Sequence, residues 1–166
     1  MSYTVFKTKK GWIGVLGTKA GLQAVTLPQT TRQQAVDALG KRVKQAEIST
    51  ELFKGLERRL QDYYSGKKTT FVETLDFSEA PTFQKHVWEA ARLIPCGETR
   101  SYGWIAKQIG KPKAARAVGQ ALGKNPFLVI VPCHRVIAGD GTLGGFGGGL
   151  EMKQKLLEME KDGLSF

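Results

Sequence analysis

Residues 101–123 read SYGWIAKQIGKPKAARAVGQALG, and they decide the fold class that we predict for the second half of the chain. Ser101 is a favourable N-cap for a helix over residues 102–109. Pro112 suits the start of a second helix over residues 113–122, and a glycine follows each helix. Two short helices joined by a tight turn that contains glycine predict a helix-turn-helix.

A cysteine follows this helix pair in a setting that is typical of a pocket. The apolar run 127–131 leads into the sequence PCHRV at 132–136, and seven glycines follow within residues 139–149. A free thiol has a pKa of about 8.5, so Cys133 needs a proton acceptor or a nearby positive charge to attack at neutral pH. His134 or a water bound to it could be that acceptor. Without further context, a lone cysteine such as Cys133 is usually a small buried residue with only a packing role.

The first half of the chain has a different pattern, in which short β-type runs are interrupted by glycine turns. We expect strands over residues 3–6, 12–16, 22–27 and 71–77, and helices over residues 31–43 and 49–64. The polar, proline-terminated segment 78–81 marks a domain boundary. We therefore expect an α/β domain over residues 1–80 and a mainly helical domain over residues 81–166, with further helices over 82–94 and 150–161.

The charge of the chain favours a polyanionic partner. It carries 25 Lys and Arg against 15 Asp and Glu, which gives a net charge of +10. Seven basic residues and no acidic residue lie between positions 100 and 135, so the helix pair is the expected phosphate-facing surface. A solvated basic face without a partner is the alternative.

Other features of the sequence concern its cellular setting. No apolar run approaches the roughly 18 residues of a membrane span, and the start MSYTVFKTKKG lacks the apolar core of a secretory signal. We expect a cytoplasmic protein that acts as a monomer and has no membrane partner. Its two cysteines, Cys96 and Cys133, are too few for a disulfide framework.

The sequence PCHRV at 132–136 resembles the signature of the O6-alkylguanine-DNA alkyltransferases, the methylated-DNA–protein-cysteine methyltransferases. The similarity continues, in order, along the last half of the chain. The other matching stretches are Ser101-Tyr102, AARAVG at 114–119, Asn125-Pro126, Gly148-Gly149-Leu150 and Glu160 in the terminal helix. The first half resembles the family only in its layout.

The resemblance implies DNA repair by direct reversal, in which the alkyl group of O6-alkylguanine, and possibly of O4-alkylthymine, moves irreversibly to Cys133 in a single turnover. It implies a ribonuclease-H-like N-terminal α/β structural domain. It also implies a helical C-terminal domain whose helix-turn-helix enters the minor groove of alkylated double-stranded DNA. Base flipping is required because the alkylated oxygen lies inside the duplex, out of reach of a thiol.

The resemblance also implies roles for individual residues of the catalytic site. His134 and Glu160 form a relay in which a water carries the thiol proton of Cys133 to an imidazole that the carboxylate holds. Asn125 braces the turn beside the cysteine. Tyr102 donates a hydrogen bond to a ring nitrogen of guanine as the base leaves.

Residues that contact DNA and residues that line the alkyl pocket follow from the same resemblance. Arg116 fills the gap left by the extruded nucleotide, and Gly119 allows a close approach. The expected DNA-binding residues are Arg116, Tyr102, Ala115 and Gly119 from the resemblance, and Arg100, Lys111, Lys113 and Arg135 from the basic stretch. The expected pocket residues are Phe146, Gly147, Val136 and Pro132. Phe146 stands where many family members have tyrosine, so the width of the pocket stays open.

We expect no cofactor and no metal. Some family members hold a structural zinc in the N-terminal domain, but residues 1–80 of this chain contain neither Cys nor His. Cys96 lies outside every matching stretch, so a structural role is expected for it.

Two other functions are compatible with parts of the pattern. A cysteine hydrolase is the enzyme alternative, although such enzymes bring Cys and His together from distant segments rather than side by side. A non-catalytic sensor of alkylated DNA or a helix-turn-helix regulator is the binding alternative. Sensors of this kind lack the nucleophile, and a regulator needs more base-reading side chains than the alanine-rich residues 113–122 offer.

Overall fold

The computed structural model describes residues 1–162, which form parts of two compact units. The first unit contains Met1–Ser78 and the separate segment Pro126–Ile130, and the second contains Glu79–Asn125 and the described residues from Val131 onward. No helix within the described residues is both long and apolar enough to cross a membrane.

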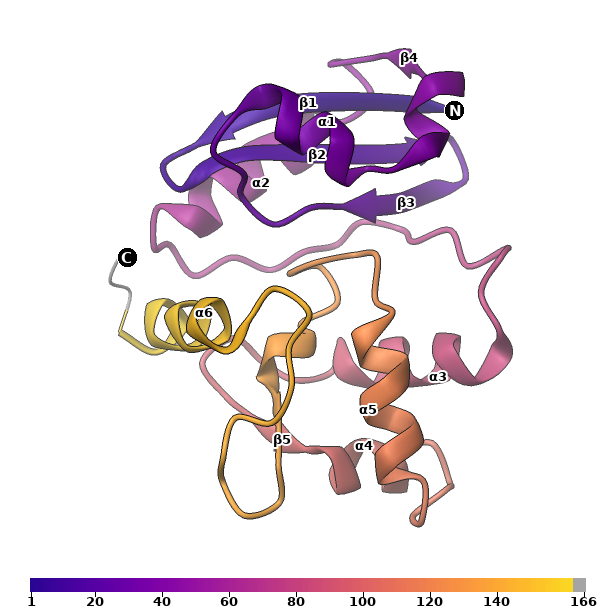
Figure 1. Cartoon of the computed structure of the whole chain (residues 1–166), viewed down its shortest axis with the longest axis vertical. Helices are drawn as coiled ribbons and strands as arrows, with labels where there is room; N and C mark the ends of the chain where they lie inside the picture. Colours follow the sequence, from indigo (N-terminus) through magenta and orange to yellow (C-terminus); the bar gives the residue numbers. More distant parts are fainter. Residues whose placement is uncertain (163–166) are drawn as a thin grey trace. The chain divides into compact units, whose positions relative to one another are not determined.

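A mixed four-stranded sheet forms the centre of the first unit (Figure 1). Its strands are β1 (Ser2–Thr8), β2 (Gly11–Thr18), β3 (Gly21–Val25) and β4 (Glu47–Ile48), in the order β3-β2-β1-β4. The first three pair in antiparallel fashion, and β4 runs parallel to β1. Gly11 has a φ of 135° in the β1–β2 turn, and a β-carbon there would lie 2.5 Å from the carbonyl oxygen of Gln29, so the turn requires glycine.

Helices α1 (Arg32–Ala38) and α2 (Lys54–Tyr64) pack on this sheet, and Figure 1 shows α1 in front of the strands and α2 behind them. The side chain of Thr31 accepts a hydrogen bond from the backbone N–H of Gln34 in a capping box, which starts α1. A β-carbon at Gly14 would lie 2.7 Å from the carbonyl oxygen of Ala35. The glycine in β2 therefore lets α1 approach the sheet closely.

Three elements of the first unit differ from the sequence predictions. The predicted helix over 31–43 ends early, because Gly40 has a φ of 83° and residues Lys41–Gln45 form a separate 3-10 helix. The predicted helix over 49–64 begins only at Lys54. The predicted strand over 71–77 is reduced to one bridge, between Leu75 and Leu22.

The segment Pro126–Ile130 belongs to the first unit although the sequence places it in the second half. The N–H of Val25 donates to the carbonyl of Pro126 at 2.8 Å, and the N–H of Leu128 donates to the carbonyl of Val25 at 3.1 Å. The ring of Phe127 packs edge-to-face on Phe77 with centroids 5.8 Å apart. These contacts within the first unit explain why this apolar run is buried with its backbone hydrogen-bonded.

The second unit is mainly helical. Its elements are α3 (Thr82–Ala91), β5 (Arg100–Ser101), α4 (Tyr102–Gln108), α5 (Ala115–Gly123), a 3-10 helix (Cys133–Arg135), β6 (Val136–Ile137) and α6 (Leu150–Asp162). The hydroxyl of Ser101 accepts from the N–H of Trp104 at 3.0 Å and caps α4, as its sequence predicts. The indole N–H of Trp88 donates to the carbonyl of Ala121 at 2.9 Å, which ties α3 to α5.

Candidate active site

Cys133 is presented by a tight turn at the start of the 3-10 helix. Pro132 has φ −80° and ψ 63°, and the N–H of Cys133 donates to the carbonyl of Val131 at 2.8 Å, which is the geometry of an inverse γ-turn. Proline restricts φ to this range, so the residue before the cysteine prepares the turn. Asn125 fixes its other side, because Nδ2 donates to the carbonyl of Val131 at 3.0 Å and to Sγ of Cys133 at 3.3 Å.

The thiol of Cys133 is protonated in this environment. Burial raises its pKa above the ordinary value, although the hydrogen bond from Asn125 and the charge of Lys153 lower it in part. The residue is only 7% exposed. Attack by this sulfur therefore requires a group that removes its proton.

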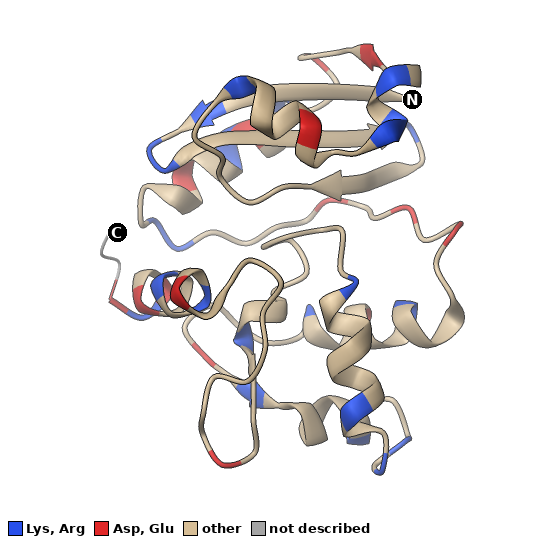
Figure 2. Ribbon diagram, viewed as in Figure 1, with Lys and Arg blue, Asp and Glu red and all other residues tan. Residues whose placement is uncertain are grey.

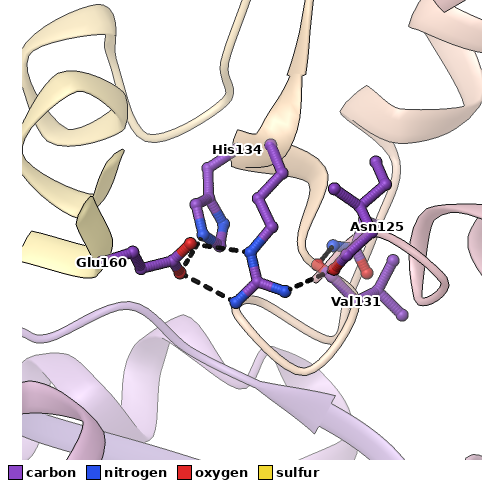
Figure 3. Close-up of polar contacts among 6 residues, drawn as sticks. Asn125, Val131, His134 and Glu160 are labelled. Carbon is purple, nitrogen blue, oxygen red and sulfur yellow. Dashed lines mark hydrogen bonds and ion pairs between the residues drawn. The ribbon is translucent and has the colours of Figure 1, made fainter. Parts of the chain in front are cut away.

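His134 and Glu160 form a buried pair next to the cysteine. Nε2 of His134 lies 2.6 Å from Oε2 of Glu160, and both side chains are 1% exposed. Figure 3 shows the carboxylate reaching from α6 toward the imidazole ring. Burial lowers the pKa of His134, so the ring is neutral at pH 7. Burial alone would raise the pKa of Glu160, but His134 and Arg135 together hold it well below its usual range, so the carboxylate is ionised.

This pairing selects the tautomer of His134. An ionised carboxylate can only accept, so Nε2 carries the hydrogen and donates it to Glu160. Nδ1 is then the basic nitrogen, and it is buried without a hydrogen-bond partner among the described residues. The ring therefore has a lone pair available to receive a proton.

Arg135 differs from its predicted place on the DNA-facing surface. It is 7% exposed, and Nε and Nη2 donate to the two oxygens of Glu160 at 2.7 and 3.0 Å. Its third nitrogen, Nη1, donates to the carbonyl of Ile94 at 2.8 Å. The guanidinium is thus used inside the second unit, and we assign Arg135 to the support of Glu160 instead of DNA contact.

A cavity of about 820 Å³ lies in the second unit and includes Cys133 in its wall. Its wall also includes six further residues that the sequence singled out, namely Tyr102, Ala115, Arg116, Gly119, Phe146 and Gly147. Pro132 and Val136, which were expected to line it, are not among its described lining residues, and Val136 is fully buried. Most of the remaining wall comes from α5 and from the glycine-rich loop.

Tyr102 is held between α5 and the glycine-rich loop. Its hydroxyl lies 3.5 Å from the carbonyl of Gly145, at the limit of a hydrogen bond. A β-carbon at Gly144, where φ is 69°, would lie 2.6 Å from the phenol oxygen, so the ring fits only against glycine. Burial raises the pKa of Tyr102, which keeps the phenol protonated and able to donate.

The remaining basic residues predicted to contact DNA lie around α4 and α5. Lys111, Lys113 and Arg116 are exposed. Arg100 forms an ion pair with Glu98 at 2.9 Å, and its Cζ lies 5.5 Å from the centroid of the Trp104 ring. Figure 2 shows basic segments at the turn between α4 and α5. This end of the helix pair carries positive charge next to the cavity that Arg116 lines.

Lys153 on α6 was not singled out from the sequence. It is fully buried, and Nζ donates to the carbonyl oxygens of Val136 at 2.7 Å, Gly145 at 3.0 Å and Leu143. A sequence signal did exist, because Lys153 lies three residues before the buried Leu156 on the same face of the helix. A lysine on an apolar helix face is rarely buried without a specific set of acceptors.

Comparison with known proteins agrees with these features. Residues 82–162 match the family described as 6-O-methylguanine DNA methyltransferase, DNA binding domain. A methylated-DNA–protein-cysteine methyltransferase of Methanosarcina acetivorans is 41% identical over 160 residues, which cover 96% of this chain and 98% of that protein.

A crystal structure of Mycobacterium tuberculosis OGT in complex with DNA has a TM-score of 0.80 and 40% identity, covering 98% of this chain and 94% of that one. The O6-methylguanine-DNA methyltransferase of Pyrococcus kodakaraensis has a TM-score of 0.70 and 27% identity over 96% of this chain and 98% of that one. The similarity extends over nearly the whole length in each case. The chain belongs to the methylated-DNA–protein-cysteine methyltransferase family.

Proposed function

We propose that this protein repairs DNA by moving the alkyl group of O6-alkylguanine onto Sγ of Cys133, once per molecule. One observation carries the proposal. Cys133 opens into the cavity that Tyr102 and Arg116 also line, while the adjacent His134 is paired with Glu160. A nucleophile, a proton acceptor and a donor for the leaving group are thus present in one unit.

The proposed reaction begins with removal of the thiol proton. Nδ1 of His134 receives it through a water, and Glu160 stabilises the charged ring that results. The thiolate of Cys133 then attacks the alkyl carbon, so that an S–C bond forms as the C–O bond breaks. The electron pair passes to guanine, and Tyr102 donates a hydrogen bond to a ring nitrogen of the departing base. The thioether product has no further acceptor, which makes the reaction irreversible.

DNA binding is assigned to α4 and α5, which we interpret as a helix-turn-helix that enters the minor groove of double-stranded DNA. Arg116 lies in the first turn of α5 and lines the cavity, so it is placed to fill the gap left by a flipped nucleotide. Ala115 and Gly119 have small side chains that allow close approach. Lys111 and Lys113 are exposed nearby and suit phosphate contacts.

The remaining assignments concern the whole chain. We propose that residues 1–80 form a ribonuclease-H-like structural domain and that residues 81–166 carry DNA binding and transfer. All the proposed catalytic residues lie in the second unit, which supports action as a monomer. The cytoplasmic location stays a prediction of the sequence, as does activity on O4-alkylthymine.

The test is the intact mass of the protein after reaction with duplex DNA that contains one O6-methylguanine. We expect an increase of one methylene group, mapped by peptide analysis to Cys133. Cys133→Ser should show no increase but should still bind DNA, and Cys96→Ser should react like the unmodified chain. A sensor would bind without any mass change, and a hydrolase would turn over repeatedly, so either result would contradict the proposal.

A further inference from the structure

We infer that Lys153 is a positioning residue for the transfer reaction, in which its ammonium group holds the glycine-rich loop in place and keeps a positive charge beside Cys133. The inference rests on the proposed function of the same cavity. The loop comprises residues 139–149, and it supplies Gly145, Phe146 and Gly147 to the cavity wall.

The contacts of Lys153 connect three separate parts of the second unit. Its side chain starts on α6, and Nζ reaches the carbonyl of Val136 in β6, directly after the 3-10 helix that carries the cysteine. The other two acceptors are the carbonyls of Leu143 and Gly145 in the loop. An ammonium group has three donors and no acceptor, so the charged form satisfies all three carbonyls. A neutral amine has only two donors and would leave one carbonyl facing a lone pair.

Apart from Tyr102, which packs on Gly144, several described positions of the loop lack close neighbours. A β-carbon at Gly139, Gly141, Gly145, Gly147 or Gly149 would meet no atom within 4 Å, so these positions have no close packing. The hydrogen bonds of Thr142 with Asp140 and Ala138 are local to the loop and its base. Removal of the ammonium would therefore release the wall of the cavity from β6.

Lys153 also acts on the placement of Tyr102. Nζ lies 5.9 Å from the centroid of the Tyr102 ring, and the carbonyl of Gly145 accepts from both Nζ and the phenol hydroxyl. A loop that moved away from Nζ would carry this shared acceptor with it. The phenol would then lose its fixed position as a donor to the leaving group.

The charge of Lys153 has a second effect, on the thiol. Among the described residues, the ammonium lowers the pKa of Cys133 and of His134 through its charge, and Nζ lies 5.9 Å from the centroid of the Tyr102 ring. Burial lowers the pKa of Lys153 itself to about 8, whereas a Cys133 thiolate raises it. Formation of the thiolate and retention of the ammonium therefore favour each other. Above pH 8 the lysine loses its charge, while Tyr102 is still protonated because burial raises its pKa.

The test measures the rate of benzyl transfer from free O6-benzylguanine, by intact mass, between pH 6 and pH 10. The variants are Lys153→Met, Lys153→Arg and the control Lys155→Met, whose side chain is 42% exposed on the same helix. At pH 7 we expect Lys153→Met to react on the order of 10²-fold more slowly, because the loop and the tyrosine are displaced. Lys155→Met should match the unmodified protein.

The pH profile separates a charged role from simple packing. In the unmodified protein we expect the rate to fall above pH 8, and in Lys153→Arg this fall should be absent because arginine keeps its charge. Transfer by Lys153→Met within twofold of the unmodified rate would overturn the inference, and so would the same alkaline fall in Lys153→Arg. Failure of the unmodified protein to take a methyl group from O6-methylguanine DNA in a parallel assay would instead contradict the proposed function.

A measurement on the unmodified protein removes any dependence on how well the variants fold. Amide hydrogen exchange of residues 139–149, corrected for the intrinsic effect of pH, should speed up at least tenfold between pH 7 and pH 9, because the ammonium that holds this loop is lost. Exchange in α5 should not change over the same range. Constant protection of the loop across pH 8 would overturn the inference.

Discussion

Glu160 is the residue on which the polar groups of the second unit converge. Its two oxygens accept from Nε2 of His134 and from two nitrogens of Arg135, at 2.6 to 3.0 Å. A buried carboxylate opposite histidine alone would favour a charged ring. Because Arg135 supplies the compensating charge, His134 can stay neutral and keep Nδ1 as a base.

Substitution of this pair gives the first prediction. Glu160→Gln and His134→Ala should each slow alkyl transfer, and the double variant should be no slower than the slower single one, because groups that act as one unit are not additive. Rates are measured as single-turnover incorporation of a labelled methyl group, at a temperature at which each variant is folded. Losses that multiply in the double variant would show that Glu160 does not act through His134.

The second prediction concerns stability and pH. Both His134 and Glu160 have a lower pKa in the folded chain than in the unfolded one, where the values are about 6.5 and about 4.3. The unfolded chain therefore binds more protons, and the stabilisation present at neutral pH is lost as pH falls, below about 6.5 for His134 and below about 4.3 for Glu160.

Denaturant unfolding between pH 7 and pH 3 measures this dependence. Glu160→Gln should be less stable by about 3–5 kcal/mol at pH 7, because Arg135 is left buried without its anion, and its stability should depend less on pH below 4.3. Glu158→Gln is the matched control, since Glu158 is exposed on the same helix. An equally steep acid loss in Glu160→Gln would contradict the assignment.

At the scale of residues, the sequence predicted which residues form the site better than it predicted the surroundings of each side chain. Family motifs named Cys133, His134 and Glu160, and the structure brings all three together in one unit, although their roles stay predictions. Arg135 was assigned to DNA because arginine in a basic stretch is usually exposed. Its burial depends on the carboxylate of Glu160, 25 positions away. The sequence around Arg135 gives no indication of such a distant partner.

At the scale of elements, α5 combines small residues with one arginine. Arg116→Ala should reduce transfer from duplex DNA by about 10- to 100-fold, equivalent to about 1–3 kcal/mol, because the gap left by the flipped base is no longer filled. Transfer from free O6-benzylguanine needs no flipping and should change much less. Lys111→Ala is the comparison, and it should weaken DNA binding and lower the salt slope by about 1. Equal losses of Arg116→Ala on both substrates would place Arg116 in the pocket alone.

The segment Pro126–Ile130 contains a strained residue. Val129 has a φ of 74°, which a β-branched residue rarely adopts, and it is 2% exposed. Val25, in β3 of the same unit, is equally buried at 1% exposed, and its φ is not positive. Val129→Gly should therefore destabilise the protein by about 1–3 kcal/mol less than Val25→Gly, because glycine relieves the strain at 129 alone. Equal losses of unfolding free energy would argue against stored strain.

The strand predicted over 71–77 forms almost no backbone pairing, although its two phenylalanines contact other rings of the first unit. Phe71 contacts the ring of Tyr63 at 5.7 Å, and Phe77 contacts Phe127 at 5.8 Å, so these alternate apolar residues do pack inward. The backbone nevertheless pairs only around Leu75, where the N–H of Leu22 donates to the carbonyl of Thr74 and the carbonyl of Leu22 accepts from the N–H of Asp76. A strand ladder needs a partner strand of matching length, and this segment pairs at Leu75 alone.

At the scale of the whole molecule, chain order and compact units do not coincide. The sequence predicts one boundary, near residue 80. The polar segment before Pro81 separates a half with short β-type runs from a half with mainly helical patterns. The segment Pro126–Ile130 leaves the second unit and joins the first, and then the chain returns to form the turn at Cys133. An apolar run of five residues predicts burial, but it carries no information on which core will bury it.

The last prediction is that alkylation lowers the stability of the protein and happens once per molecule. Part of an alkyl group can lie in the cavity of about 820 Å³, but Sγ of Cys133 is packed against Nδ2 of Asn125 at 3.3 Å. Added atoms on the sulfur crowd that contact, and overfilling a packed site costs about 1–3 kcal/mol. For a chain of this size, each kcal/mol lowers Tm by about 2–4 °C.

We therefore expect Tm to fall after a stoichiometric titration, more for the benzyl product than for the methyl product. Asn125→Ala should start from a lower Tm and should show a smaller fall on alkylation, because the contact that is crowded has already been removed. Removal of more than one alkyl group per molecule would contradict the single turnover. A Tm that is unchanged or raised by benzylation would mean that the glycine-rich loop, whose glycines at 145 and 147 have open space around them, absorbs the added group without strain.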